Sequence, residues 1–221
     1  MDLDEAIAAL RGAANADDAG PMAAYMKNVA PFLGVKKPGR AKAAGPLLAA
    51  ARRRPWEEAE LLGAMERLAA EPEREFHYLA IDLFGASAAS VAWPALTGRV
   101  VPFLDHRPWW DTVDALRAEM GRWTRARPVR LRPLAARLAS GSMWARRAAI
   151  TLQLQWKDGT DRAVLANAIE ANQSDPEFFI QKAIGWALRD FARTDPIWVR
   201  AFLADHTLTP LARREASKHL P

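Results

Sequence analysis

Apolar residues recur three and four positions apart along nearly the whole 221-residue chain. This spacing places them on one face of an α-helix, whereas a half-buried strand would alternate apolar and polar positions. Short turns containing Pro or Gly separate the periodic segments, and no Asn-Gly hairpin signal occurs between them. The pattern predicts helices over residues 3–13, 20–30, 40–53, 56–70, 73–85, 88–103, 108–119, 129–139, 142–156, 160–171, 176–193, 195–204 and 209–219.

Helices of this length, joined by short turns, are expected to pack as antiparallel neighbours. The similar spacing of successive pairs indicates a superhelical solenoid of helical hairpins, although internal sequence identity is too weak to define a repeat period. No linker or low-complexity stretch divides the chain. We therefore expect residues 1–221 to form one all-α domain with a concave surface.

Charge is segregated along the chain, which has a formal net charge of +5. No Asp or Glu occurs between Asp18 and Glu57 or between Glu119 and Asp158, yet these two windows hold 17 of the 31 Lys and Arg residues. Segregation of this kind suits a face that binds a polyanion, because each neutralised phosphate releases counterions. The alternative is that both windows are ordinary solvated helix surfaces. The first window supplies the candidate polyanion contacts Lys36, Lys37 and Arg40.

Composition and motifs exclude several kinds of site. The chain has no Cys, so disulfides and thiolate metal sites are excluded. The histidines show neither an i,i+4 pair nor an HExxH motif, so we expect no metal and no cofactor. Phosphate-binding loops, dinucleotide fingerprints and GxSxG motifs do not occur. Without a long apolar run or a signal-peptide pattern, the chain is predicted to be cytoplasmic, with no membrane contact.

The predicted helix over 176–193 has two distinct stripes. The apolar stripe consists of Ile180, Ile184, Ala187 and Phe191. A second stripe, on another face, consists of Phe178, Lys182, Trp186, Arg189 and Arg193. A Trp among three cations away from the core is poorly explained by packing. The alternative is that neighbouring helices cover Trp186 while the cations extend around it.

The segment "PWWDTVDAL", which begins at Pro108, divides in the same way. Pro108 suits the first helical position, and Asp111 lies in the first turn, where a negative charge favours the helix dipole, so its predicted role is structural. Trp110 and Asp114 are i,i+4 neighbours on a face away from the core. The predicted core stripe of this helix is made of Trp109, Val113 and Leu116.

A third helix, over 142–156, leaves Arg146 or Arg147 outside its apolar stripe, which consists of Ala145, Ala149, Leu152 and Trp156. If the three faces converge, the site contains two Trp, one Asp and one Arg in a basic setting. A carboxylate between aromatic rings suits hydrolysis of a glycosidic bond, because both stabilise an oxocarbenium-like transition state. One Asp suffices where the leaving base already carries a positive charge from alkylation.

The order and spacing of these motifs resemble the AlkD-like DNA alkylation repair family, and the resemblance covers essentially the whole chain. This family consists of HEAT-like-repeat DNA glycosylases that remove N3- and N7-alkylated purines. The motifs that carry the resemblance are "PMAAYMKNVAPFLGVKKPGR" (21–40), "EREFHYLAIDL" (73–83), "WWDTVD" (109–114), "MWARRAAITLQLQWK" (143–157), "EFFIQKAIGWALRDFARTDP" (177–196) and "LARREASKHL" (211–220).

The resemblance implies a catalytic carboxylate at Asp114 and lesion-facing tryptophans at Trp110 and Trp186. It also implies that Arg147 lies beside the carboxylate and holds the DNA backbone. The predicted DNA-binding residues, from the resemblance and the charge pattern together, are Tyr25, Lys27, Lys36, Lys37, Arg40, Arg146, Phe178, Phe179, Lys182 and Arg189.

Members of this family grip the duplex through its backbone and leave the modified base stacked. The resemblance therefore implies a monomeric, monofunctional glycosylase of the bacterial cytosol or nucleoid, which binds duplex DNA containing alkylated purines and leaves an abasic site. Two alternatives remain open. One is a non-catalytic helical-repeat module that binds damaged or distorted DNA, and the other is a helical-repeat scaffold with no affinity for DNA.

Overall fold

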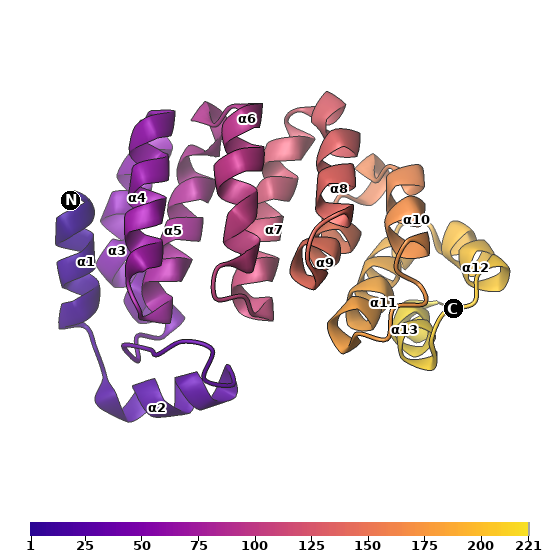
Figure 1. Cartoon of the computed structure of the whole chain (residues 1–221), viewed down its shortest axis with the longest axis horizontal. Helices are drawn as coiled ribbons and strands as arrows, with labels where there is room; N and C mark the ends of the chain where they lie inside the picture. The colour runs from indigo at the N-terminus through magenta and orange to yellow at the C-terminus, as the bar shows by residue number, and fades with distance from the viewer. Residues whose placement is uncertain (221) are drawn as a thin grey trace. The chain divides into compact units, whose positions relative to one another are not determined.

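The computed structural model describes residues 1–220, apart from the side chain of His219. Within this range the regular secondary structure is helical and contains no strand, so the all-α prediction is confirmed. The α-helices of the described residues are α1 (Leu3–Gly12), α2 (Ala16–Tyr25), α3 (Lys37–Arg53), α4 (Glu58–Ala70), α5 (Arg74–Ser87), α6 (Trp93–Ala95), α7 (Trp110–Arg125), α8 (Leu131–Ala139), α9 (Met143–Thr151), α10 (Arg162–Glu170), α11 (Phe178–Ala192), α12 (Pro196–Asp205) and α13 (Pro210–Ala216) (Figure 1).

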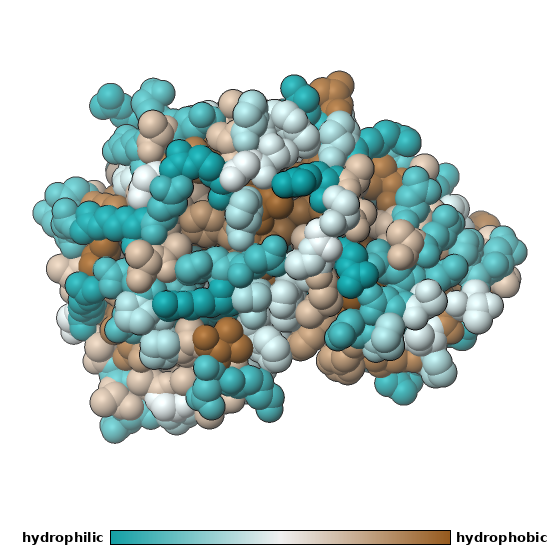
Figure 2. All heavy atoms as spheres, viewed as in Figure 1, coloured by the Kyte–Doolittle hydropathy of each residue, from teal (hydrophilic) through white to brown (hydrophobic). Residues whose placement is uncertain are grey.

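Contacts between residues divide the chain into two compact units, Met1–Glu119 and Met120–Pro221. The boundary falls within α7. In the view of Figure 2, hydrophilic residues cover much of the visible surface and apolar residues show in patches between them. Every residue of the apolar stripes predicted from the sequence except Trp109 is buried, while the single domain over 1–221 stays a prediction.

The first unit is built from helices that pack side by side. α3 contacts α1 and α5, and α5 also contacts α4 (Figure 1). Only residues 71–73 connect α4 to α5, so these two helices run antiparallel. Their side chains Leu61, Met65, Leu68, Phe76 and Phe84 are 0% exposed. Burial of each such side chain stabilises the fold by about 1.5–3 kcal/mol relative to exposure.

In the second unit, α11 contacts α9, α12 and α13. Its predicted apolar stripe is confirmed, since Ile180 and Ile184 are 0% exposed and Phe191 is 5% exposed. Gly185 lets α13 approach α11 closely, because a Cβ atom at this position would lie 2.4 Å from the Cβ of Glu215. α11 is therefore positioned both by its apolar stripe and by Gly185, which has no side chain to hold α13 away.

The bounds predicted for the helix over 20–30 are wrong, because the helix in this region, α2, spans Ala16–Tyr25. The side chain of Asn15 accepts a hydrogen bond from the backbone N–H of Asp17, at 3.0 Å, and caps the start of the helix. Lys27 and Asn28 then adopt left-handed φ values of 58° and 55°, which an α-helix does not contain. The Asn-x-Asp-Asp sequence at 15–18 is the start signal that the apolar pattern did not reveal.

Two further predicted helices are interrupted. The segment over 88–103 forms short turns: a 3₁₀ turn at Ala88–Ser90, α6, a π-helical turn at Leu96–Val100 and a 3₁₀ turn at Val101–Asp105. Pro94 and Pro102 explain these breaks, because Pro has no N–H to donate to a carbonyl one turn earlier. In the segment over 142–156, α9 ends at Thr151, and Gln155 takes a left-handed φ of 66° while its N–H donates to Asp190 Oδ2 at 2.7 Å.

Candidate active site

The start of α7 carries the predicted Trp110–Asp114 pair on a partly exposed face. Val113 and Leu116 are each 1% exposed and form the predicted core stripe, whereas Trp109 is only partly buried. Pro108 is not the first helical residue, because α7 begins at Trp110. The carbonyl of Trp109 instead accepts the first helical hydrogen bond, from the N–H of Val113 at 3.1 Å.

Tyr25, at the end of α2, extends this aromatic face. Its side chain is 71% exposed and meets Trp110 edge to face, with ring centroids 6.4 Å apart. Aromatic pairs in this geometry stabilise one another by about 0.5–1.5 kcal/mol beyond their buried area. The predicted DNA-binding residue Tyr25 and the predicted lesion-facing residue Trp110 are therefore in contact within the first unit.

A buried ion pair fixes the beginning of α7. Arg74 of α5 is 1% exposed and binds Asp111 through two hydrogen bonds, Nε to Oδ2 at 2.9 Å and Nη2 to Oδ1 at 2.5 Å. Arg74 also donates to the carbonyl of Arg107, at 2.6 Å, and to Oγ1 of Thr112, at 3.0 Å. These contacts hold the chain on both sides of the two tryptophans.

Tyr78, one turn after Arg74 on α5, donates its hydroxyl to Asp111 Oδ2 at 2.5 Å. Burial alone would raise the pKa of Asp111, but the hydrogen bonds and charge of Arg74 lower it below its ordinary value. Burial, and then the negative charge of Asp111, raise the pKa of Tyr78. Asp111 thus stays ionised as an anchor for α7, in agreement with its predicted structural role.

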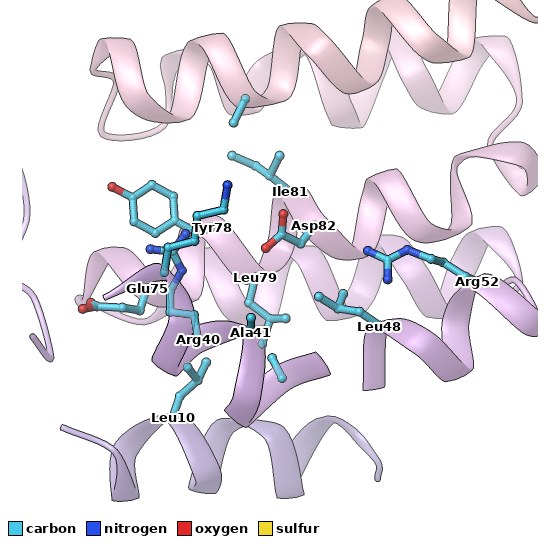
Figure 3. A pocket seen from close by; sticks show the side chains of 13 residues that line it. Leu10, Arg40, Ala41, Leu48, Arg52, Glu75, Tyr78, Leu79, Ile81 and Asp82 are labelled. Atoms are coloured by element: carbon cyan, nitrogen blue, oxygen red, sulfur yellow. The ribbon is translucent and has the colours of Figure 1, made fainter. Parts of the chain in front are cut away.

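Three of the predicted cationic residues of the first unit, Lys36, Lys37 and Arg40, lie at the start of α3, and Lys27 follows α2. Lys36 pairs with Asp18 at 2.7 Å, and the guanidinium of Arg40 lies 4.2 Å from the centroid of the Tyr78 ring. Lys27 and Lys37 are exposed. Lys37 and Arg40 also line a cavity of about 360 Å³, in which Figure 3 shows Arg40 beside Tyr78 at one end and Arg52 at the other.

A buried carboxylate shapes the loop that leads into this cationic segment. Glu75 is 0% exposed and accepts hydrogen bonds from the backbone N–H groups of Leu33, Gly34 and Val35, at 2.9, 3.0 and 2.9 Å. Gly34 has φ +84°, and a Cβ atom there would lie 2.0 Å from the carbonyl oxygen of Asn15. The placement of Lys36 and Lys37 thus depends on Glu75, which the sequence pattern did not single out.

Replacing Glu75 by Gln is expected to destabilise the protein by about 2 kcal/mol, because the amide NH₂ group would face backbone donors and leave at least one buried N–H unpaired. Urea unfolding followed by circular dichroism measures this difference. The control is Glu60→Gln, since Glu60 is an exposed acid of α4. Equal unfolding midpoints for the two variants would contradict the role assigned to Glu75.

The second unit contains the predicted Arg147, Trp186 and Phe179 in one cluster. Arg147 of α9 is 5% exposed, and its Nη1 donates to the carbonyl of Phe179 at 2.8 Å. Its guanidinium carbon lies 5.8 Å from the ring centroid of Phe179 and 5.9 Å from that of Trp186. Phe179 also contacts Trp144 and the 56% exposed Phe178, with centroids 5.0 and 5.4 Å away.

Neighbouring residues cover Arg147 as well as the apolar stripe of α9, so burial is not confined to one face of this helix. Arg146 is the partly exposed member of the pair, and it binds Asp175 at 2.8 Å and Asn172 Oδ1 at 3.3 Å. Lys182 and Arg189, on either side of Trp186 along α11, both bind Glu215. The structure therefore gives these three predicted DNA contacts acidic partners within the protein.

The histidines of the first unit have structural contacts. His77 and His106 meet edge to face with centroids 5.3 Å apart, and their Nε2 atoms lie 3.0 and 2.8 Å from the carbonyls of Glu71 and Ala69. Burial lowers the pKa of His77 to about 4.

Within the described residues, no group of three or more acids and histidines is placed to hold a metal ion. No helix in that part of the chain has the length and apolar character needed to cross a membrane.

Helices that pack side by side within each unit, with no strand among the described residues, place this chain among the all-helical proteins. The sequence profile of a family described as DNA alkylation repair enzyme matches residues 6–220. A solved structure described as a predicted DNA alkylation repair enzyme from Enterococcus faecalis is 35% identical, with a TM-score of 0.89 over 94% of this chain and 96% of that chain. No curated protein matches the chain. The chain belongs to the DNA alkylation repair enzyme family, and a role in DNA repair follows from that membership.

Proposed function

We propose that this protein is a monofunctional DNA glycosylase that hydrolyses the N-glycosidic bond of N3- or N7-alkylated purines in duplex DNA. The observation that carries the proposal is the division of the two acids at the start of α7. The side chain of Asp111 is 6% exposed and is held by Arg74 and Tyr78 as an anchor of α7, and Asp114 lies one turn from Trp110 on the partly exposed face. Membership of the DNA alkylation repair family supports the same assignment.

In the proposed reaction, the bond between C1′ of the deoxyribose and the alkylated base breaks, and its electron pair neutralises the cationic base. The sugar becomes an oxocarbenium ion, which the carboxylate of Asp114 stabilises. A water molecule oriented by Asp114 adds to C1′ and loses a proton, which leaves an abasic site. Because the base departs as a neutral molecule, no general acid is required.

The aromatic residues and the buried arginine have supporting roles in this proposal. Trp110 and Trp186 pack against the deoxyribose, where their faces stabilise developing positive charge. Arg147 holds the DNA backbone, and its contact with the carbonyl of Phe179 keeps the guanidinium in a fixed orientation. Backbone contacts of this kind suit recognition without base flipping, with selectivity that comes from the lability of a cationic base.

A single-turnover assay on a duplex containing 7-methylguanine tests the proposal. The expected result is release of free 7-methylguanine and formation of alkali-labile abasic sites, with no release from the unmethylated duplex. DNA binding without abasic sites would instead identify a non-catalytic module for damaged or distorted DNA. Neither binding nor base release would indicate a protein scaffold.

A further inference from the structure

Three cations converge on one buried carboxylate in the second unit. The side chain of Glu215, on α13, is 8% exposed. Lys218 binds both of its oxygens at 2.9 Å, Arg189 binds Oε2 at 2.5 Å and Lys182 lies 3.2 Å from Oε1. Two of these cations come from α11, and Lys218 follows the end of α13. We refer to these four residues as the Glu215 cluster.

The Glu215 cluster contains more positive charge than the carboxylate requires. One cation neutralises one acid, so the cluster has a net charge of +2. The pKa of Glu215 is lowered to about 2, chiefly by the hydrogen bond from Lys218, so the carboxylate is ionised at neutral pH. A carboxylate offers about four acceptor positions, whereas two ammonium groups and one guanidinium offer about eleven N–H donors. The cluster can therefore bind a further anion with donors that Glu215 does not use.

The three cations remain accessible from solvent although they share a buried anion. Lys182, Arg189 and Lys218 have side chains that are 39%, 25% and 49% exposed. Held close to one another by Glu215, they repel, and an incoming phosphate relieves that repulsion. Ionic contacts of this kind are also shorter and stronger than neutral hydrogen bonds. The ligand that suits the cluster is consequently a phosphodiester or another compact oxyanion.

The position of the cluster on α11 links it to the proposed reaction. Lys182 precedes Trp186 by four residues and Arg189 follows it by three, so all three side chains occupy one stripe of the helix. A phosphodiester bound by the cluster would therefore lie beside Trp186, which the proposed function places against deoxyribose. A nucleotide contributes both groups, a sugar and the phosphate attached to it.

We propose that the Glu215 cluster is a preformed clamp for a DNA backbone phosphate, in which Lys182, Arg189 and Lys218 bind the phosphate and Glu215 acts as a positioning residue. This inference rests on the proposed function in taking DNA as the ligand and in placing Trp186 against the deoxyribose. It assigns roles to Lys218 and Glu215. It also explains why Lys182 and Arg189, two predicted DNA contacts, bind an acid within the protein.

The first test is Lys218→Gln in the full-length protein, with binding to an unmodified duplex measured by fluorescence anisotropy between about 50 and 200 mM salt. Loss of one phosphate contact is expected to reduce the slope of log K against log salt by about 0.9. Arg162→Gln is the matched control, because this substitution also removes one positive charge. Arg162 is exposed and pairs with Asp195 in the same unit. If the salt slope of Lys218→Gln equals that of wild type, the clamp is wrong. The Glu215 cluster would then be only an ion network that joins α11 and α13.

The second test is Glu215→Gln, for which two roles predict opposite signs. If Glu215 were only a nearby negative charge, its removal would tighten DNA binding. As a positioning residue, its loss frees cations that must be ordered again on binding, so affinity falls about two- to tenfold for each such side chain. Circular dichroism confirms that the variant is folded at the assay temperature, and tighter binding would overturn the positioning role.

The clamp and the proposed glycosylase activity can fail separately. If wild-type protein releases no 7-methylguanine but Lys218→Gln still changes the salt slope, the clamp stands and the glycosylase assignment fails. If base release is observed and the slope does not change, the glycosylase assignment stands and the clamp fails. Measuring both quantities on the same preparations distinguishes these results.

Discussion

Replacing Asp114 by Asn is expected to slow the single-turnover release of 7-methylguanine by about 10²–10³-fold, which is the usual effect of removing one group that stabilises transition-state charge. The substitution keeps the size of the side chain and removes its negative charge. The oxocarbenium ion then forms without a nearby anion, and the attacking water loses its acceptor. Quantifying free base under enzyme excess measures this effect without interference from product release.

Affinity for the duplex is the internal control for this prediction. If Asp114 faces DNA as proposed, removing its negative charge reduces repulsion of the phosphates, so the Kd of Asp114→Asn for unmodified duplex should equal or fall below that of wild type. Asp158→Asn, at an exposed Asp, makes the same chemical change elsewhere and should retain full activity. Full base release by Asp114→Asn would exclude Asp114 as the catalytic carboxylate.

The helical fold could be predicted from the sequence wherever an apolar stripe continued between Pro or Gly residues. α3, α4, α5 and α11 begin and end within three residues of the predicted bounds, because their stripes are long and are interrupted by turn residues. Some predictions failed for local reasons, such as the Asn15 cap and the prolines of 88–103, and another failed where a hydrogen bond with a distant residue decided the conformation. Gln155 is an example, since its N–H binds Asp190, 35 residues further along the chain.

Candidate site residues could be singled out from the sequence where they stand off an apolar stripe, whereas the residues that hold them in place could not. Trp110, Trp186 and Lys182 were singled out as candidates because a large or charged side chain broke a helical period. Glu75 and Glu215 lie in apparently ordinary amphipathic segments, and their partners are separated from them by up to 42 residues in sequence. Burial of a charged group depends on such long-range contacts, which periodicity does not report.

Arg74→Met is expected to cost about 3–5 kcal/mol of unfolding free energy, because it leaves the carboxylate of Asp111 buried without its cation. The two side chains are 1% and 6% exposed, so water cannot replace the lost contacts. This cost is a large share of the roughly 5–15 kcal/mol that stabilises a folded protein. Urea unfolding with an unchanged m-value measures it directly.

Two further variants separate the ion pair from its surroundings. Arg99→Gln breaks the exposed pair with Glu66, at 43% and 53% exposure, and should cost at most about 1 kcal/mol. The double variant Arg74→Met/Asp111→Leu removes both buried charges and should recover part of the loss, because no unpaired ion remains. A double variant as unstable as Arg74→Met would show that the hydrogen bonds from Arg74 to Arg107 and Thr112 dominate over its pairing with Asp111. In either case the start of α7, which carries Trp110 and Asp114, depends on the buried Arg74 of α5.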